Sequence, residues 1–179
     1  NNMAVKQFNL ATGQRAERKT LITVVEWTDP TSDASTPIRE ILGTRTEDSS
    51  IEYNPDITTS TDILGYNYTD INKTEPSQSF DPFLVLGGSK LGALLNDIRR
   101  RNAYTELNQF TVYIITAFIG NATDGYEAEK QTDCTIAYTA IGGDTKVNFP
   151  IEVHFSNKTT LGKVDKLTSD FTFTPDVDV

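Results

Sequence analysis

The chain has one histidine and one cysteine, the two side chains with the widest chemical repertoire. His154 lies beside Glu152 in "VNFPIEVHF", and a lone imidazole leaves out most triads and metal sites, which need an imidazole together with partners. Cys134 opens the apolar run "CTIAYTAI" with no basic neighbour in sequence to favour its thiolate. We therefore expect an exposed or interfacial histidine and an inert core thiol, and neither a general base nor a nucleophile.

The stretch "LVLGGSKLG" raises the question of phosphate binding. A phosphate-binding loop needs the spacing G-x-x-x-x-G-K-S/T, which lets successive backbone amides wrap the phosphate while the lysine reaches it. Here the two glycines are adjacent and Lys90 is followed by Leu91. We expect a glycine hinge that leads into a helix, with Ser89 capping the free amides at its start.

Acidic stretches occur at "TDPTSD", "TEDSS" and "TPDVDV", and none has the spacing of a twelve-residue calcium loop. Arg99, Arg100 and Arg101 fall at the expected helix end, where they complement the helix dipole; a contact with DNA is the alternative. The net charge of −9 disfavours a surface that grips a nucleic-acid backbone. The sequence thus predicts a non-enzymatic protein with no catalytic residue, no cofactor and no metal.

Length and composition indicate one domain rich in turns and strands. The chain has 179 residues, 37% of them hydrophobic, with short runs of Thr, Ser, Asn and Asp between the apolar segments. A single cysteine cannot form an intramolecular disulfide, which is typical of a reducing compartment. No run approaches the roughly 20 apolar residues of a membrane span. We expect residues 1–19 to form an N-terminal arm and residues 20–179 a single β-sandwich domain.

Hydrophobic periodicity predicts a mainly β, α+β fold with one helix. Period-two patterns mark strands at 21–27, 38–45, 50–54, 60–69, 110–119, 134–141 and 147–155, with a short one near 171–173. Residues 69–83 are polar and contain two prolines, so we expect a connection there. Pro150 cannot donate to a ladder, which places its strand at a sheet edge or at a bulge.

The expected helix follows Ser89, where Leu91, Leu94, Leu95 and Ile98 share one face. The strand at 110–119, "FTVYIITAFI", is instead apolar on both faces. In a small domain the second face implies burial by a partner, so Tyr113, Ile115 and Ala117 are the candidate inter-subunit face. Charging Tyr113 or Ile115 is expected to block assembly and to leave a folded subunit.

The region from Ser50 to Gly162 resembles the major tail proteins, or tail tube proteins, of long-tailed bacteriophages. The resemblance lies in "SIEYNPDITTSTDILGYNYTDINKTEPSQSFDPFLVLGGSKLGALLNDIRRRNA", "FTVYIITAF" and "AEKQTDCTIAYTAIGGD". It implies a β-sandwich or partly closed barrel flanked by one helix. It further implies rings, usually of six subunits, that stack into a hollow tube for DNA during ejection.

The resemblance also implies partners and contact regions. The long polar loop with Asp29, Asp33 and Ser35, and the arm from Met3 to Lys19, are the candidate inter-ring contacts. Other tail proteins, the tape measure and the tail terminator, are the expected partners, in a virion tail assembled in the host cytoplasm without a membrane. DNA passes without specific binding, since fixed negative charge repels phosphates.

A monomeric β-sandwich that recognises carbohydrate, or an adhesin-like module, is the alternative. Such modules usually display a cluster of exposed aromatic side chains or a calcium loop. Trp27 stands alone in the sequence, while Tyr66 and Tyr68 share one face of a polar run. We therefore rank the carbohydrate-recognition hypothesis below the tail tube hypothesis.

Overall fold

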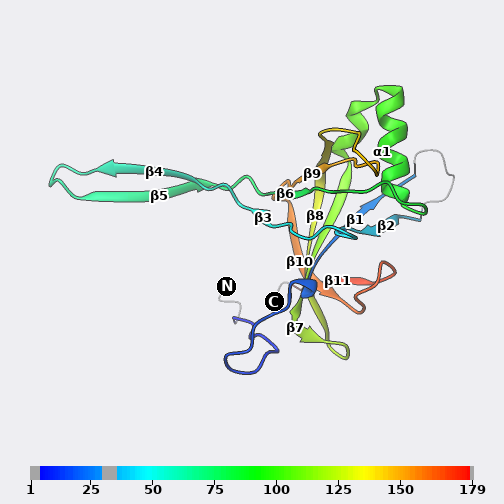
Figure 1. Ribbon diagram of the computed structural model, residues 1–179. Coiled ribbons are helices and arrows are strands. Elements are labelled where there is room, and N and C mark those ends of the chain that lie inside the picture. Colours follow the sequence, from blue (N-terminus) through cyan, green and yellow to red (C-terminus); the bar gives the residue numbers. More distant parts are fainter. Residues whose placement is uncertain (1–4, 30–35, 178–179) are drawn as a thin grey trace.

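The computed structural model describes residues 5–29 and 36–177 (Figure 1). The mainly β, α+β class predicted from the sequence is confirmed. The strands are β1 (Leu21–Trp27), β2 (Ile38–Ile41), β3 (Ile51–Glu52), β4 (Asp56–Thr61), β5 (Asn67–Lys73), β6 (Ser77–Phe80), β7 (Phe110–Asn121), β8 (Gly125–Tyr138), β9 (Ile151–His154), β10 (Thr159–Val164) and β11 (Phe173–Pro175). The helical elements are α1 (Lys90–Arg101) and two 3₁₀ segments, η1 (Arg18–Thr20) and η2 (Tyr104–Asn108).

The main sheet is antiparallel and follows the order β2-β1-β7-β8-β9-β6-β3. The long strand β8 changes its outer partner along its length: residues 126–131 pair with β10, and residues 135–138 pair with β9. β11 extends the sheet beyond β10. No backbone pairing joins β2 to β3 within the described parts of the chain, so the sheet curves without closing into a barrel.

The larger core lies between α1 and one face of the sheet. Leu91, Leu95 and Ile98 of α1 are buried against β1, β6, β7 and β9, as the helical spacing predicts. The Ser89 hydroxyl accepts a hydrogen bond from the Gly92 amide at 3.1 Å, which confirms the predicted cap. Burial of this apolar face stabilises the helix in place.

A second, smaller core covers the opposite face of β7, and it corrects the prediction made for that face. Tyr113, Ile115 and Ala117 are 2%, 0% and 8% exposed in the single chain. Phe171 and Phe173 lie edge-on against the Tyr113 ring, at 4.9 and 5.5 Å between centroids. Because the C-terminal segment of the same chain covers this face, the inference that it needs a neighbouring subunit is wrong.

The Tyr113 hydroxyl lies at the polar rim of this second core. It donates to the Glu26 carboxylate at 3.3 Å, and Arg39 binds the same carboxylate at 2.6 Å. Burial, with the nearby Glu26 charge, raises the pKa of Tyr113 to about 12. The ring is therefore fixed at both ends and belongs to the interior of the subunit.

The middle of the chain departs most from the predicted strands. The strand expected at 60–69 spans the end of β4, a turn at 62–66 and the start of β5, and the polar connection expected at 69–83 contains most of β5 and all of β6. Two short Thr-rich segments around one turn gave a single period-two run, because alternation alone does not reveal a reversal of direction. The helix and the strands at 21–27 and 110–119 lie where they were predicted.

The C-terminal third also differs from the predicted pattern. β10 was missed because "TTLGKV" alternates weakly. β9 pairs with both β8 and β6 in continuous register, so neither the edge position nor the bulge inferred from Pro150 is found there. Pro150 lies just before the strand, where it needs no amide, and its carbonyl accepts from the Thr139 amide at 2.9 Å.

Candidate assembly surfaces

A two-stranded hairpin projects from the body of the molecule (Figure 1). It consists of β4, a turn at residues 62–66, and β5, and we call it the hairpin. Among the described residues the two strands pair only with each other, and every residue of both is exposed. An isolated two-stranded sheet is marginally stable in water, so a surface of this kind is expected to be covered in the working state.

The turn of the hairpin is specified by its own side chains. The Asp62 carboxylate accepts from the amides of Leu64 and Tyr66, both at 2.9 Å, and the Asp62 amide donates to the Tyr66 carbonyl. Gly65 has a φ of +86°, a left-handed conformation that glycine adopts without a Cβ clash. This local chemistry fixes the tip and holds its side chains outward.

The hairpin carries apolar side chains that no described part of the chain covers. Ile63 and Leu64 at the tip are 102% and 76% exposed, with Tyr66 beside them. Ile57 and Ile71 are cross-strand partners nearer the base. Their side chains lie side by side on one face of the hairpin, and each is more than half exposed. A stretch of exposed aliphatic and tyrosine side chains on one protrusion marks an interaction site.

The base of the hairpin is anchored to the body. The Asn54 amide side chain donates to the Glu75 carbonyl at 3.1 Å, and the Glu75 amide donates to the Tyr53 carbonyl. Asn157, at the start of the loop before β10, donates to the Thr74 carbonyl at 3.0 Å. These bonds fix where the hairpin leaves the body, so it is aimed outward as a unit.

The N-terminal arm is the second exposed region, described from Val5 onward. Phe8 lies edge-on to Phe118 with 5.6 Å between the ring centroids, and the Asn9 side chain donates to the carbonyls of Ala117 and Gly120. Lys6 binds Glu127 at 2.6 Å. Residues 11–19, in contrast, are exposed throughout. The first part of the arm is therefore docked on the β7–β8 end, and the second part is presented to solvent.

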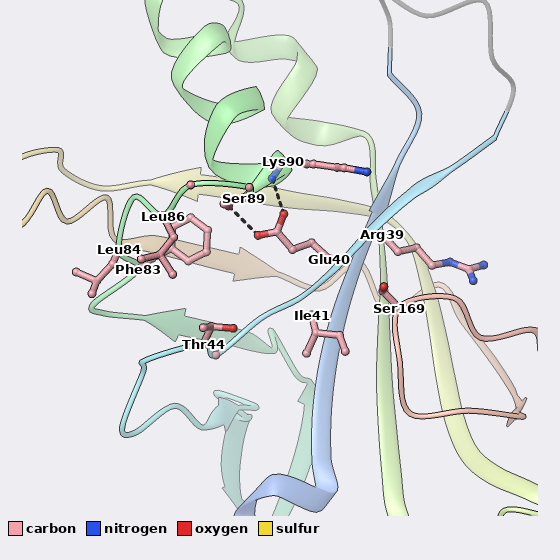
Figure 2. A pocket seen from close by; sticks show the side chains of 13 residues that line it. Arg39, Glu40, Ile41, Thr44, Phe83, Leu84, Leu86, Ser89, Lys90 and Ser169 are labelled. Carbon is pink, nitrogen blue, oxygen red and sulfur yellow. Dashed lines mark hydrogen bonds between the residues drawn. The ribbon is translucent and has the colours of Figure 1, made fainter.

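The glycine stretch lines a cleft of about 420 Å³ beside α1 (Figure 2). The Glu40 carboxylate points at the first turn of the helix and accepts from the Ser89 hydroxyl and from the amides of Lys90 and Leu91, at 2.8–2.9 Å. A carboxylate at this position complements the helix dipole. The amides of Lys90 and Leu91, which a phosphate would use, are thus bonded by the chain itself, and the predicted hinge stays a prediction.

The other residues singled out for chemistry lie apart from one another. His154 is half exposed, 3.6 Å from the Glu152 carboxylate, as expected for a surface residue. Cys134 is fully buried, and burial raises the pKa of its thiol. Within the part of the chain that the structure describes, no three His, Cys, Asp or Glu side chains are placed to hold a metal ion.

The residues predicted to contact other subunits lie in different environments, and two of them are outside the described residues. Tyr113, Ile115 and Ala117 are interior residues. Asp29 lines a cleft with Arg39 and Lys90, whereas Asp33 and Ser35 lie outside the described residues, so the inter-ring loop stays a prediction. The hairpin was missed, although "DILG" between two Thr-rich segments is a turn signal that could have revealed it.

No protein-family model matches the chain, and no curated protein matches it. Among solved structures, the fold is similar to that of a chain in the cryo-EM structure of the anti-feeding prophage baseplate, symmetrised six-fold. The match covers 88% of this chain and 100% of that chain, with a TM-score of 0.51 and 11% sequence identity. The likeness shows a shared fold. No helix in residues 5–29 or 36–177 is long and apolar enough to cross a membrane.

Proposed function

We propose that this chain is a structural subunit of a phage tail or tail-like assembly, and more finely a tail tube protein. The hairpin carries the proposal, because a fully exposed two-stranded sheet with aliphatic side chains at its tip needs a partner. The fold shared with a chain of the anti-feeding prophage baseplate supports a tail-related setting. The sequence resemblance to tail tube proteins supports the finer assignment.

In this function the subunit acts by geometry. The strands of the hairpin have six and seven residues. At about 3.4 Å per residue, they reach about 20 Å beyond the body, far enough to overlap a neighbouring subunit. A protrusion that binds a different surface of the next copy forms a heterologous contact, which closes into a ring or continues as a filament. We propose rings of six that stack into a tube.

The charge of the chain suits a channel for DNA. With 25 acidic against 16 basic side chains, an assembled wall repels phosphates and lets DNA pass without specific binding. We propose that a tape measure protein occupies the lumen before ejection and that a tail terminator caps the tube. No catalytic role is proposed for any residue.

The test is negative-stain electron microscopy of the purified protein over a concentration series, with light scattering to give the mass. Rings or tubes with a central channel are the expected result. A strictly monomeric particle at every concentration would overturn self-assembly. A glycan-binding screen would then test the carbohydrate-recognition alternative, for which the exposed Tyr53, Tyr66 and Tyr68 provide the aromatic surface.

A further inference from the structure

We propose that the hairpin of one copy binds the basic part of the N-terminal arm, residues 15–19, of a second copy. This inference rests on the proposed function, since it names the surface that the hairpin meets when subunits assemble. The charges of the two surfaces and their positions on the molecule support this pairing.

The hairpin is acidic, and its one lysine neutralises only part of its charge. Residues 56–73 contain Asp56, Asp62 and Asp70 against the single Lys73, a net charge of −2. Lys73 lies opposite Asp56 across the two strands and also binds Glu75 at 2.5 Å, so its charge is shared between two carboxylates. Asp70 is exposed on the face opposite the isoleucine pair, and no side-chain bond holds it within the described residues. An exposed acidic sheet fits a cationic partner.

The basic part of the arm concentrates the opposite charge. Residues 15–19 contain Arg15, Arg18 and Lys19 against Glu17, a net charge of +2 in a chain that totals −9. Arg18 is held by the carbonyls of Leu21 and Ser49, and Lys19 bonds the exposed Glu17 at 2.6 Å. Arg15 is exposed, and in the described part of the chain it makes no ion pair. The segment therefore presents cationic groups to solvent.

The other basic cluster of the described chain is already engaged. Arg101 binds Asp97 at 2.8 Å and Glu106 at 2.9 Å, and Arg99 donates to Asn96 at 2.8 Å. Arg100 is left as a single exposed cation, and Lys146 is another in a turn distant in sequence. Arg100 and Lys146 are far apart in sequence, whereas Arg15, Arg18 and Lys19 lie within five exposed residues, so residues 15–19 are the better match for a surface with three aspartates.

The two surfaces occupy different parts of the molecule, which makes the pairing intermolecular. The hairpin extends to one side of the body (Figure 1), whereas residues 15–19 lie on the body beside the start of β1, where Arg18 is held by the carbonyls of Leu21 and Ser49. One copy can thus give its hairpin to the next copy and receive a hairpin on its own arm. Such head-to-tail contacts propagate through a ring or a tube.

Charge reversal on each side tests the pairing. R15E/K19E and D56K/D70K are each expected to raise the concentration at half-assembly at least tenfold, by light scattering at low salt, and the fourfold variant to restore assembly. R100E/K146E is the matched control. Like R15E/K19E, it replaces two basic residues with glutamate and so takes the net charge from −9 to −13. It should leave assembly unchanged. A fourfold variant no better than either double variant would overturn the pairing.

A second measurement does not depend on assembly by the wild type. A synthetic peptide of residues 5–19, titrated into the full chain, is expected to shift the amide NMR signals of β4 and β5 and to shift none of them in D56K/D70K. The R15E/K19E peptide is the control. Binding to the hairpin by a wild type that never assembles would overturn the tail function and support the pairing. Absence of binding, with no charge-swap rescue, would overturn the pairing even if rings form.

Discussion

The β7–β8 ribbon and the β4–β5 hairpin are both antiparallel pairs of strands, but the first lies in the interior of the subunit and the second is exposed. β7 has a core on each face: Val112 and Ile114 point into the larger one, Tyr113 and Ile115 into the smaller. β4 and β5 have no buried residue on either face. One ribbon is the centre of the subunit, and the other is wholly outside it (Figure 1).

Apolar content alone therefore does not predict where a subunit meets its neighbours. β7 is apolar on both faces, and its own C-terminal segment, polar in sequence apart from a few residues, supplies Phe171 and Phe173 to cover the second face. The hairpin, rich in threonine, is covered by no segment among residues 5–29 and 36–177. A surface remains available to a partner where no described segment of the chain packs on it, whether that surface is apolar or polar.

The largest effect expected from this comparison is on stability, in a matched pair of isoleucine substitutions. Ile115→Asp places an unpaired carboxylate at a fully buried position of β7 and should lower the free energy of unfolding by about 4–5 kcal/mol. Ile71→Asp makes the same chemical change where the side chain is 66% exposed and should change it by no more than about 0.5 kcal/mol. Urea unfolding followed by tryptophan fluorescence measures both.

This pair reverses the expectation from sequence that a charge at Tyr113 or Ile115 leaves a folded subunit. If Ile115→Asp folds as well as Ile71→Asp, the smaller core does not contribute to stability and the C-terminal segment is a loose cover. Equal and large losses at both positions would instead mean that the hairpin is packed in the free subunit. Either result would break the contrast between the two ribbons.

Removal of the hairpin separates assembly from folding. Replacing residues 56–73 with a short Gly-Ser turn should leave the midpoint of urea unfolding within about 0.3 M, because no buried side chain is lost. The same change should abolish rings and tubes in electron micrographs. A control variant with only the tip changed, I63S/L64S, should weaken assembly less, since it keeps the acidic faces. Tubes formed without the hairpin would assign assembly to another surface.

The sequence predicts those parts of the fold in which local pattern and burial agree. The helix after Ser89 and the strand at 21–27 satisfy both, so each was located. The hairpin was missed because its exposed strands carry no burial pattern, and only the turn around Gly65 marks the reversal. β9 was misplaced at an edge because a proline outside a strand looks the same in sequence as a proline within it.

The position of the interface was the hardest feature to predict, for a physical reason. Which segment covers the second face of β7 depends on contacts between residues about 58 positions apart, such as Tyr113 and Phe171. Nothing local at Tyr113 distinguishes a partner subunit from a distant part of the same chain. In the same way, Glu40 bonds the start of α1 although it lies 49 residues before Ser89, so no local pattern predicts its role.

Loss of the Glu40 contacts should lower the free energy of unfolding by an intermediate amount. Glu40→Ala removes three hydrogen bonds to the first turn of α1 and should cost about 1.5–3 kcal/mol, the range for bonds to a charged group. Ser89→Ala removes the cap of the Gly92 amide and should cost about 1 kcal/mol. Urea unfolding of the two variants gives the comparison. A smaller loss at Glu40 than at Ser89 would show that water replaces the carboxylate without penalty.

The smallest expected effect is at Glu129, on the β7–β8 ribbon. It lies on β8, opposite Ile114, and burial raises the pKa of its carboxyl above the ordinary 4.5. Its charge in turn contributes to the raised pKa of Tyr53, which precedes the hairpin. The fold therefore binds this proton more tightly than the unfolded chain does, so the stabilisation is complete below pH 4.5 and is lost as pH rises through the raised value.

Glu129→Gln removes that titration and keeps the shape of the side chain. At neutral pH the variant should be more stable than the wild type by under about 1 kcal/mol, since the wild type there keeps a half-buried carboxylate charged. The difference should disappear as pH falls below 4.5, in urea unfolding of both proteins over a pH series. A difference that persists in acid would assign the gain to packing. A wild type more stable at pH 7 would mean that the carboxylate has a cationic partner there, and assembly on the hairpin side of β8 would be the place to look for it.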